Sequence, residues 1–318
     1  MTFRHRVYVA AAVASAAVVQ PCVAQNAYPH EIVTLVTHSS PGGGSDVFLR
    51  ELARYLEPVM GVTFVVENAR GGSGARAMAR LASAPADGSI FYATTPTYIY
   101  TSLLSRPANN YNDLDPLVNV FFDEEVVYTR SNGPFHTLAD VIAAARSDRG
   151  RWGASTPASL ERQALEQLKT AAGVQSAIVS HEGGGDLMLN VLNGTLDIGV
   201  GEAQEIRGQL AAGNLRVLAV FSAERVADLP AVPTVRESGY DIALSKFRGL
   251  AAPKGLPQEI IVAWENAIQR VLNDPAYREL YEAEMLSPAF MSHAEYAPFM
   301  DGFVSRTEAF LRATGVLQ

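Results

Sequence analysis

The sequence predicts an α/β protein built as two lobes, and three observations support this. Short apolar runs alternate with helical patterns, which is typical of largely parallel sheets covered by helices. Two blocks of similar content, 26–122 and 126–222, follow one another. The tail after them is helical and contains no convincing strand. Helices without a sheet of their own must cover an existing one, so we expect the tail to pack on the first block.

The elements follow from the spacing of the apolar residues and from the turns between them. The predicted strands lie at 32–37, 62–66, 89–93, 117–121, 126–129, 152–154, 177–180, 196–200 and 216–221, and an extended segment runs from Leu244 to Ala251. The predicted helices lie at 45–58, 74–84, 137–146, 159–171, 185–192, 203–212, 257–273 and 293–313. Strand and helix therefore alternate through both blocks.

The route of the chain after the second block predicts how the lobes divide. Two prolines in the run Asp228 to Pro233 interrupt regular structure, and the chain then returns to the first block. We expect a discontinuous lobe 1, residues 25–122 plus 248–318, and a lobe 2 of residues 123–247. Crossings near 121–127 and 244–250 would join them. Two lobes joined by two crossing strands can hinge, which places a ligand cleft between them.

Residues 1–24 have the pattern of a secretory signal peptide. Arg4 and Arg6 precede the apolar stretch 7–19, and Cys22-Val23-Ala24 supplies small residues at a cleavage site. Cleavage after Ala24 would remove the single cysteine, so the mature protein would have no disulfide and no cysteine metal site. We expect a periplasmic protein, exported by a cleaved signal peptide, with an ordinary hydrophobic core.

Composition and charge exclude several classes of protein. Hydrophobic residues make up 48% and charged residues 18% of the chain, as in globular proteins. The formal net charge of −8 argues against nucleic acid and anionic membrane surfaces as partners. Because an acidic protein repels anions overall, an anion site must be made by local N–H groups and a few placed cations.

Three glycine-rich turns each follow a strand and open a helix: Pro41 to Asp46, Asn68 to Gly74, and His181 to Asp186. Glycines bare successive backbone N–H groups, and the start of a helix adds partial positive charge, so such a turn suits an anion, most simply a carboxylate. The first and third turns occupy equivalent places in the two blocks and would clamp a dicarboxylate from both sides. One such turn alone is equally explained as a tight connection.

An ordered set of short segments matches a known family. The segments are Tyr28-Pro29, Pro41-Gly42-Gly43-Gly44-Ser45-Asp46, Val65-Val66-Glu67-Asn68, Ala86-Asp87-Gly88, Gly183-Gly184, 212–220, 229–239 and 249–257. With these the chain closely resembles the Bug-type extracytoplasmic solute receptors of tripartite tricarboxylate transporters, over essentially the whole mature chain.

The resemblance implies a type II periplasmic-binding-protein fold whose lobes close on a small organic acid. The family's ligand contacts, carried onto this chain, would be Ser39, Gly43, Ser45, Asp46, Thr94, Thr95 and Thr97 in the first lobe and Ser155, Ser159, Gly183, Gly184 and Glu202 in the second. Simpler alternatives remain, because Ser45 and Asp46 can cap helix 45–58 and residues 94–97 can form a plain turn.

The chain also departs from the family around the expected pocket. The departures are His38-Ser39, where a Pro-aromatic pair is frequent, His181-Glu182 for Tyr-Lys, Arg162 for His, and Arg248, just after Phe247, for an aromatic residue. We expect Arg162 and Arg248 to grip a carboxylate and Glu202 to take an ammonium or hydroxyl group, so that the acid also bears one of these. His181 and Phe247 are further candidates. Alternatively, the charged side chains face solvent and His181 makes structural hydrogen bonds.

Catalytic motifs are incomplete in this sequence. The run Gly71 to Ala75 lacks the final Gly of a nucleophile elbow, His181-Glu182 lacks a second His, and no P-loop exists. We expect no enzyme, no catalytic residue, no metal and no cofactor, with a hydrolase as a remote alternative.

The expected partners are a small organic acid or acidic amino acid and the membrane permease subunits of a tripartite transporter. We expect a monomer that binds no nucleic acid. The alternative is a periplasmic ligand sensor that presents the bound acid to a membrane signalling protein, because both roles need the same closing cleft.

Overall fold

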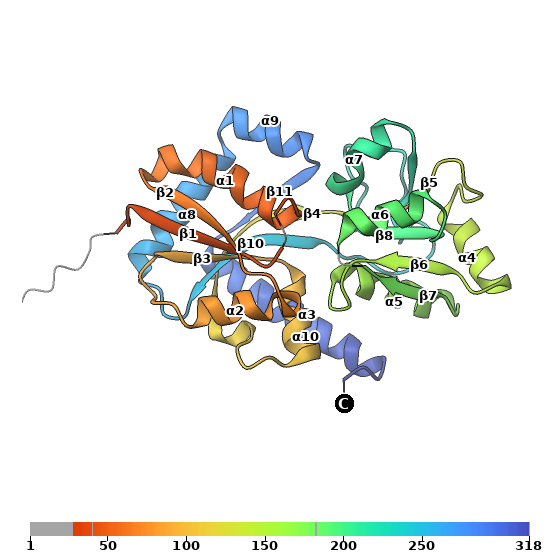
Figure 1. Cartoon of the computed structure of the whole chain (residues 1–318), viewed down its shortest axis with the longest axis horizontal. Coiled ribbons are helices and arrows are strands. Elements are labelled where there is room, and N and C mark those ends of the chain that lie inside the picture. Colours follow the sequence, from red (N-terminus) through yellow and green to blue (C-terminus); the bar gives the residue numbers. More distant parts are fainter. Residues whose placement is uncertain (1–27, 40, 182, 318) are drawn as a thin grey trace, which may run out of the picture.

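Two α/β lobes lie side by side in the computed structural model, which describes residues 28–317 except 40 and 182 (Figure 1). The lobe drawn in red, orange and blue combines the first part of the chain with its end, and the green lobe is formed by the middle part. The predicted signal peptide lies outside the described residues. No helix in the described part of the chain is both long and apolar enough to cross a membrane.

The first lobe, lobe 1, contains a six-stranded sheet in the order β11-β4-β10-β3-β1-β2. Its strands are β1 (Ile32–Thr37), β2 (Thr63–Asn68), β3 (Ile90–Thr94), β4 (Leu114–Asp123), β10 (Lys246–Pro253) and β11 (Leu286–Met291). β1 is parallel to β2 and β3, whereas β10 and β11 are antiparallel to β4. β10 and β11 come from the last part of the chain and return to this sheet.

Helices cover both faces of this sheet. One face packs against α1 (Gly44–Met60), α8 (Gln258–Leu272) and α9 (Pro275–Ala283), and the other against α2 (Ala75–Ala82), α3 (Pro96–Ser105) and α10 (His293–Ala313). Two single-turn helices, η1 (Gly72–Gly74) and η2 (Tyr111–Asp113), lie in the connections. Trp264 anchors the first face, with its ring 4.2 Å from that of Phe91, and Phe247 anchors the second, 5.2 Å from Phe303.

Lobe 2 repeats this layered arrangement with a five-stranded sheet, β7-β6-β8-β5-β9. Its strands are β5 (Glu125–Arg130), β6 (Arg151–Ala154), β7 (Ala177–Ser180), β8 (Ile198–Glu202) and β9 (Leu215–Val220). One face is covered by α4 (Leu138–Ser147) and α5 (Leu160–Ala172), the other by α6 (Gly184–Leu192) and α7 (Ala203–Ala211). Fully buried Trp152 of β6 packs in the core under α4 and α5.

The two sheets are joined where the sequence predicts crossings. Glu124 alone separates β4 from β5, and the second crossing enters β10 at Lys246. The crossings touch, since Ser245 Oγ donates to Glu124 Oε2 at 3.3 Å. The lobe boundaries stay a prediction, with residues 25–122 plus 248–318 in lobe 1 and 123–247 in lobe 2. The strands of the two sheets follow the orders given above.

Three elements correct the sequence prediction. β11 is a strand in the tail, where no further strand is expected; it lies at the edge of its sheet, where the missing N–H of Pro288 is tolerated. Residues 96–105 form α3 rather than a plain turn, with Pro96 at the first helical position. The third is α9, a helix that lies between the predicted helices 257–273 and 293–313. It begins at Pro275 and is capped by Asp274, whose side chain accepts a hydrogen bond from Ala276 N at 2.8 Å.

Candidate functional site

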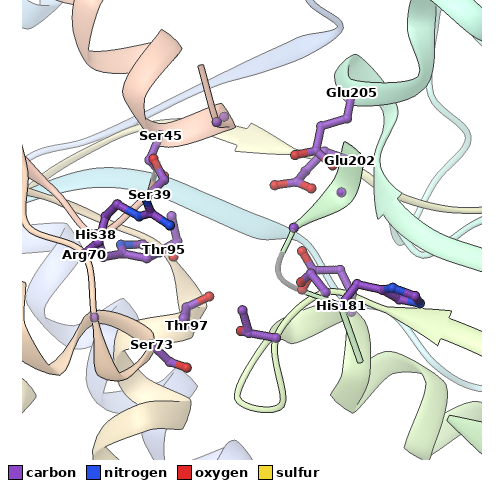
Figure 2. Close-up of a pocket in the computed structure, with 18 of the residues that line it drawn as sticks. His38, Ser39, Ser45, Arg70, Ser73, Thr95, Thr97, His181, Glu202 and Glu205 are labelled. Atoms are coloured by element: carbon purple, nitrogen blue, oxygen red, sulfur yellow. The ribbon is translucent and has the colours of Figure 1, made fainter. Parts of the chain in front are cut away.

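A cavity of about 920 Å³ lies between the lobes. Lobe 1 contributes the ends of β1 and β3 and the two turns that precede α1 and α2, and lobe 2 contributes the ends of β6, β7 and β8. Figure 2 shows serine and threonine hydroxyls on the lobe 1 side facing the carboxylates of Glu202 and Glu205 on the lobe 2 side. The cavity therefore lies at the carboxyl ends of parallel strands, the usual ligand position in α/β folds.

The first glycine turn presents free N–H groups to this cavity. Gly43 is the N-cap of α1, and the N–H groups of Gly43, Gly44 and Ser45 have no acceptor among the described residues. The first N–H groups of a helix have no intrahelical partner, and the helix dipole adds positive charge there. This end of α1 can thus bind an anion.

Asp46 holds the turn in shape. Its carboxylate accepts hydrogen bonds from Gly42 N at 2.8 Å, from Arg50 at 2.9 and 3.0 Å, and from Asn68 Nδ2 at 2.9 Å. Burial disfavours its charge, but the hydrogen bonds from Arg50, Gly42 and Asn68 outweigh burial and keep the pKa of Asp46 below its usual range. A carboxylate with these partners orients the turn and does not face the cavity.

The two threonines at the end of β3 differ in their hydrogen bonds. Thr95, the N-cap of α3, lines the cavity, and its Oγ1 is buried without a partner in the described structure. Thr94 Oγ1 instead pairs with the hydroxyl of Tyr296 at 2.9 Å. A buried hydroxyl without a partner is costly, so Thr95 is prepared to bind a ligand oxygen.

His38 lies beside the first turn as a neutral group. Its Nδ1 is 3.0 Å from the Tyr92 hydroxyl. Burial lowers the pKa of His38 to about 4, helped by the nearby charges of Lys246 and Arg248. His38 is therefore uncharged at neutral pH and offers hydrogen bonds rather than charge.

Lys246 stands at the floor of the cavity in a cage of carboxylates. Its Nζ donates to Glu161 Oε1 at 2.9 Å, pairs closely with Glu202, and lies 3.6 Å from Glu125. Burial opposes its charge, but Glu161, Glu202 and Glu125 more than compensate, so the pKa of Lys246 rises well above its usual value. The ammonium is permanently charged and fully engaged.

Arg248 is the second buried cation near the cleft. It is 1% exposed, pairs closely with Asp123 and reaches Glu202 at 3.3 Å and Ser45 Oγ at 3.4 Å. A Cβ on Gly44 would come within 2.7 Å of its guanidinium, so Arg248 lies directly behind the first turn of α1. Arg248 thereby links both lobes to the crossing strand β4.

Glu202 and Glu205 form a carboxyl pair on the lobe 2 wall. Burial disfavours the charge of Glu202, yet Lys246 and Arg248 overcome burial and lower its pKa to about 2. Burial and the negative charge of Glu202 raise the pKa of Glu205 well above its usual value. A Cβ on Gly184 would overlap the Glu205 carboxyl group, so this group fills the start of α6.

Comparison with known proteins identifies the family of this chain. The family model for the tripartite tricarboxylate transporter family receptor, TctC, matches residues 48–316. The chain belongs to this receptor family. Its members are periplasmic solute-binding receptors, a class without enzymatic activity.

Individual relatives extend over nearly the whole receptor. Protein BugT of Bordetella pertussis (strain Tohama I) is 28% identical over 312 residues, which is 95% of each chain. An R. palustris structure, Rpa4515 with adipate, is 25% identical, covers 91% of this chain and 99% of that chain, and superposes with a TM-score of 0.84. The periplasmic binding protein BugD shares the fold at 23% identity, with a TM-score of 0.81 and coverage of 91% and 99%. The predicted Bug-type resemblance and two-lobed type II fold are confirmed.

The receptor structure brings most of the predicted ligand-binding residues to the cavity. Those that line it are Ser39, Gly43, Ser45, Thr95, Thr97, Ser155, His181, Gly183, Gly184 and Glu202. The His181 ring extends away from the lobe 1 side chains in Figure 2, and its Nε2 is buried without a partner among the described residues. Ligand contact of these residues stays a prediction.

The structure places the remaining candidates of the receptor outside the lining. They are Asp46, Thr94, Ser159, Arg162, Phe247 and Arg248. Ser159 caps α5 by accepting from Arg162 N at 3.2 Å. The guanidinium of Arg162 donates to Ser180 Oγ at 3.1 Å and to Glu166 at 3.1 Å, and Phe247 is fully buried in the core. Neither Arg162 nor Arg248 lines the cavity, and the guanidinium group of each is hydrogen-bonded to side chains of the protein.

Several residues that line the receptor's cleft are missing from the sequence prediction: His38, Arg70, Glu161, Glu205 and Lys246. Two of them carry a usable signal. Lys246 is two residues before Arg248 on a strand, which places both on the same face. Glu205 is three residues after Glu202 at the start of a helix, which brings the two carboxyl groups together.

Proposed function

We propose that this receptor is exported to the periplasm, closes on a small carboxylate-bearing organic acid and delivers it to a tripartite membrane permease. The observation that carries the proposal is the start of α1, where three N–H groups without acceptors in the described structure meet the cavity beside the buried hydroxyl of Thr95. These groups suit one carboxylate. The adipate in the related R. palustris protein supports this ligand class.

The acid is further proposed to bear an amino or hydroxyl group. Glu202 and Glu205 face the cavity opposite the first turn, and carboxyl groups accept hydrogen bonds from such groups. Delivery to a permease is supported by the family to which the receptor belongs. We further propose that the receptor is no enzyme, so a bound acid should be recovered chemically unchanged, as NMR of the incubated acid would show.

A thermal-shift screen of organic acids and amino acids tests the proposal. A ligand at a hundredfold excess over its Kd adds about 2.7 kcal/mol to the free energy of unfolding, which raises the melting temperature measurably. Thr95→Val should weaken binding of the best acid by about tenfold or more, because a hydrogen bond to a charged oxygen is lost. It should leave the unliganded protein as stable as before, because Thr95 Oγ1 has no partner in the described structure.

Thr94→Val is the matched control. Its hydroxyl pairs with Tyr296 outside the cavity lining, so this change should cost stability and spare the affinity for the acid. If no acid shifts the melting temperature, the proposed function is wrong. For export, mass spectrometry of the periplasmic protein should find a chain that begins at Gln25.

A further inference from the structure

We propose that the ligand carries one carboxylate and one cationic nitrogen, and that Glu202 and Glu205 hold the cationic end. This inference rests on the proposed function of an acid receptor and narrows its ligand to a single class, amino-substituted monocarboxylates. The carboxylate end would lie at the start of α1 in lobe 1, across the cavity.

The cations near lobe 2 are already occupied. The Lys246 ammonium is shared by Glu161 and Glu202, and the Arg248 guanidinium by Asp123 and Glu202. A ligand carboxylate that approached either cation would have to displace a buried internal carboxylate. Breaking a buried ion pair leaves an uncompensated charge, which is strongly unfavourable. Lobe 2 therefore offers no free cation for a second ligand carboxylate among its described lining residues.

The second glycine turn is also filled from within the protein. The Glu205 carboxyl group lies so close to Gly184 that a Cβ there would come within 2.6 Å of its carboxyl carbon. Gly184 is the first residue of α6, where an anion would bind. The equivalent place in lobe 1, at the start of α1, has no carboxylate in the cavity lining. The two turns look alike in sequence but differ in what they can accept.

The lobe 2 wall instead contains carboxyl groups that are not fully paired within the described structure. Glu161 is 2% exposed and lines the cavity, and its Oε2 has no hydrogen-bond partner among the described residues. Glu205 has no cation of its own in the described structure, and burial together with Glu202 raises its pKa. Lys246 shows that this wall accepts an ammonium group, since its Nζ lies among Glu125, Glu161 and Glu202.

Lobe 1 has the opposite character. Its described lining contains no Asp or Glu, but it contains Arg70, the start of α1 and the unpartnered Thr95 hydroxyl. His38 is neutral because burial lowers its pKa to about 4. The cavity thus has a wall that attracts anions and a wall that attracts cations. A molecule with one group of each sign satisfies both walls at once, whereas a dicarboxylate leaves its second charge facing Glu202 and Glu205.

Isothermal calorimetry with matched pairs of acids tests this inference. The pairs differ only in the group at one end: 3-aminopropanoate and succinate, 4-aminobutanoate and glutarate, 5-aminopentanoate and adipate. Pentanoate is the control that has a carboxylate at one end and an uncharged methyl group at the other. Neutral α-amino acids form a fourth set. We expect an amino-substituted monocarboxylate to bind best, with an affinity about tenfold or more above that of its dicarboxylate counterpart. If any dicarboxylate binds at least as tightly as every amino acid tested, the inference is wrong while the proposed function stands.

Glu205→Gln tests the assigned residue. It keeps the shape of the side chain but cannot ionise against a ligand ammonium group, so the preference for the amino compound should fall about tenfold. Asp186→Asn is the control, because Asp186 is an exposed carboxylate in the first turn of α6 that does not line the cavity. An unchanged preference in Glu205→Gln, or an equal change in Asp186→Asn, would overturn the assignment. Failure of every acid to bind would overturn the proposed function and this inference with it.

Discussion

The charge of single residues in the cleft depends on their burial and on the groups beside them. His38 is the clearest example, because the unfolded chain leaves it with a pKa near 6.5 whereas the folded protein lowers its pKa to about 4. Arg248 and Lys246 keep their charge because each lies against carboxylates. Whether a buried basic side chain is neutral or charged thus depends on whether a carboxylate lies beside it.

His38 should make the stability of the receptor depend on pH. As the pH falls from about 6.5 towards 4, His38 takes up a proton in the unfolded chain but not in the folded one, so the free energy of unfolding falls by up to about 3 kcal/mol. His38→Gln removes this contribution. Urea unfolding of both proteins at several pH values measures it, and the difference cancels the other titrating groups. A difference that stays constant between pH 7 and 4 would contradict the assignment.

The sequence predicts which residues line the cleft better than it predicts their partners. The serines, threonines and glycines at strand ends are predictable, because the carboxyl ends of parallel strands meet at one edge. The partners of Arg248 are not, since Asp123 lies 125 positions away and comes into contact through the pairing of β10 with β4. A sequence pattern shows that a cation is present but not whether an internal carboxylate already occupies it.

At the scale of elements, the two helix starts that face the cleft show how one motif acquires two roles. α1 begins at a turn tied down by Asp46 from outside the cavity, and α6 begins at a turn filled by Glu205 of α7. The elements themselves were largely predictable from apolar spacing. β11 was not, because Pro288 in its centre argues for a loop until the edge position is known.

Gly184→Ala probes the filled helix start directly. The new Cβ would collide with the Glu205 carboxyl group, and overpacking of this kind costs about 1–3 kcal/mol of stability. At Gly185, the next residue in the same helix, an added Cβ would meet no described atom within 4 Å beyond its chain neighbours and its own helix, so Gly185→Ala should gain up to about 1 kcal/mol of stability. Urea unfolding compares the two. Equal effects of both substitutions would mean that Glu205 does not rest against α6.

At the scale of the whole molecule, two sheets meet at two crossings, and the ligand cavity lies between them. The crossings lie close together, as the contact between Ser245 and Glu124 shows. Lobes joined by two neighbouring crossings can rotate towards each other, and such a rotation must rearrange the other contacts between them, such as the ion pair of Arg207 with Glu284 at 2.9 Å.

Ligand binding should therefore make the molecule more compact. Small-angle X-ray scattering with the best acid of the screen should give a smaller radius of gyration than the unliganded protein, because both walls contact the ligand only when the lobes approach. Thr95→Val at the same acid concentration is the control, since its weaker binding should leave more molecules open. An unchanged radius at saturating acid would mean that the lobes do not move.

The single residue between β4 and β5 has a consequence for anyone who builds a biosensor from this receptor. Glu124 is flanked by Asp123 and Glu125, which hold the cations that also contact Glu202 in the ligand wall. A substitution of Glu202 that changes ligand selectivity would therefore also change the signal of the unliganded sensor, because the same cations contact the crossing between the lobes. Arg70, exposed on the opposite wall and remote from the crossing strands in sequence, is the better place to retune selectivity while the switch keeps its baseline.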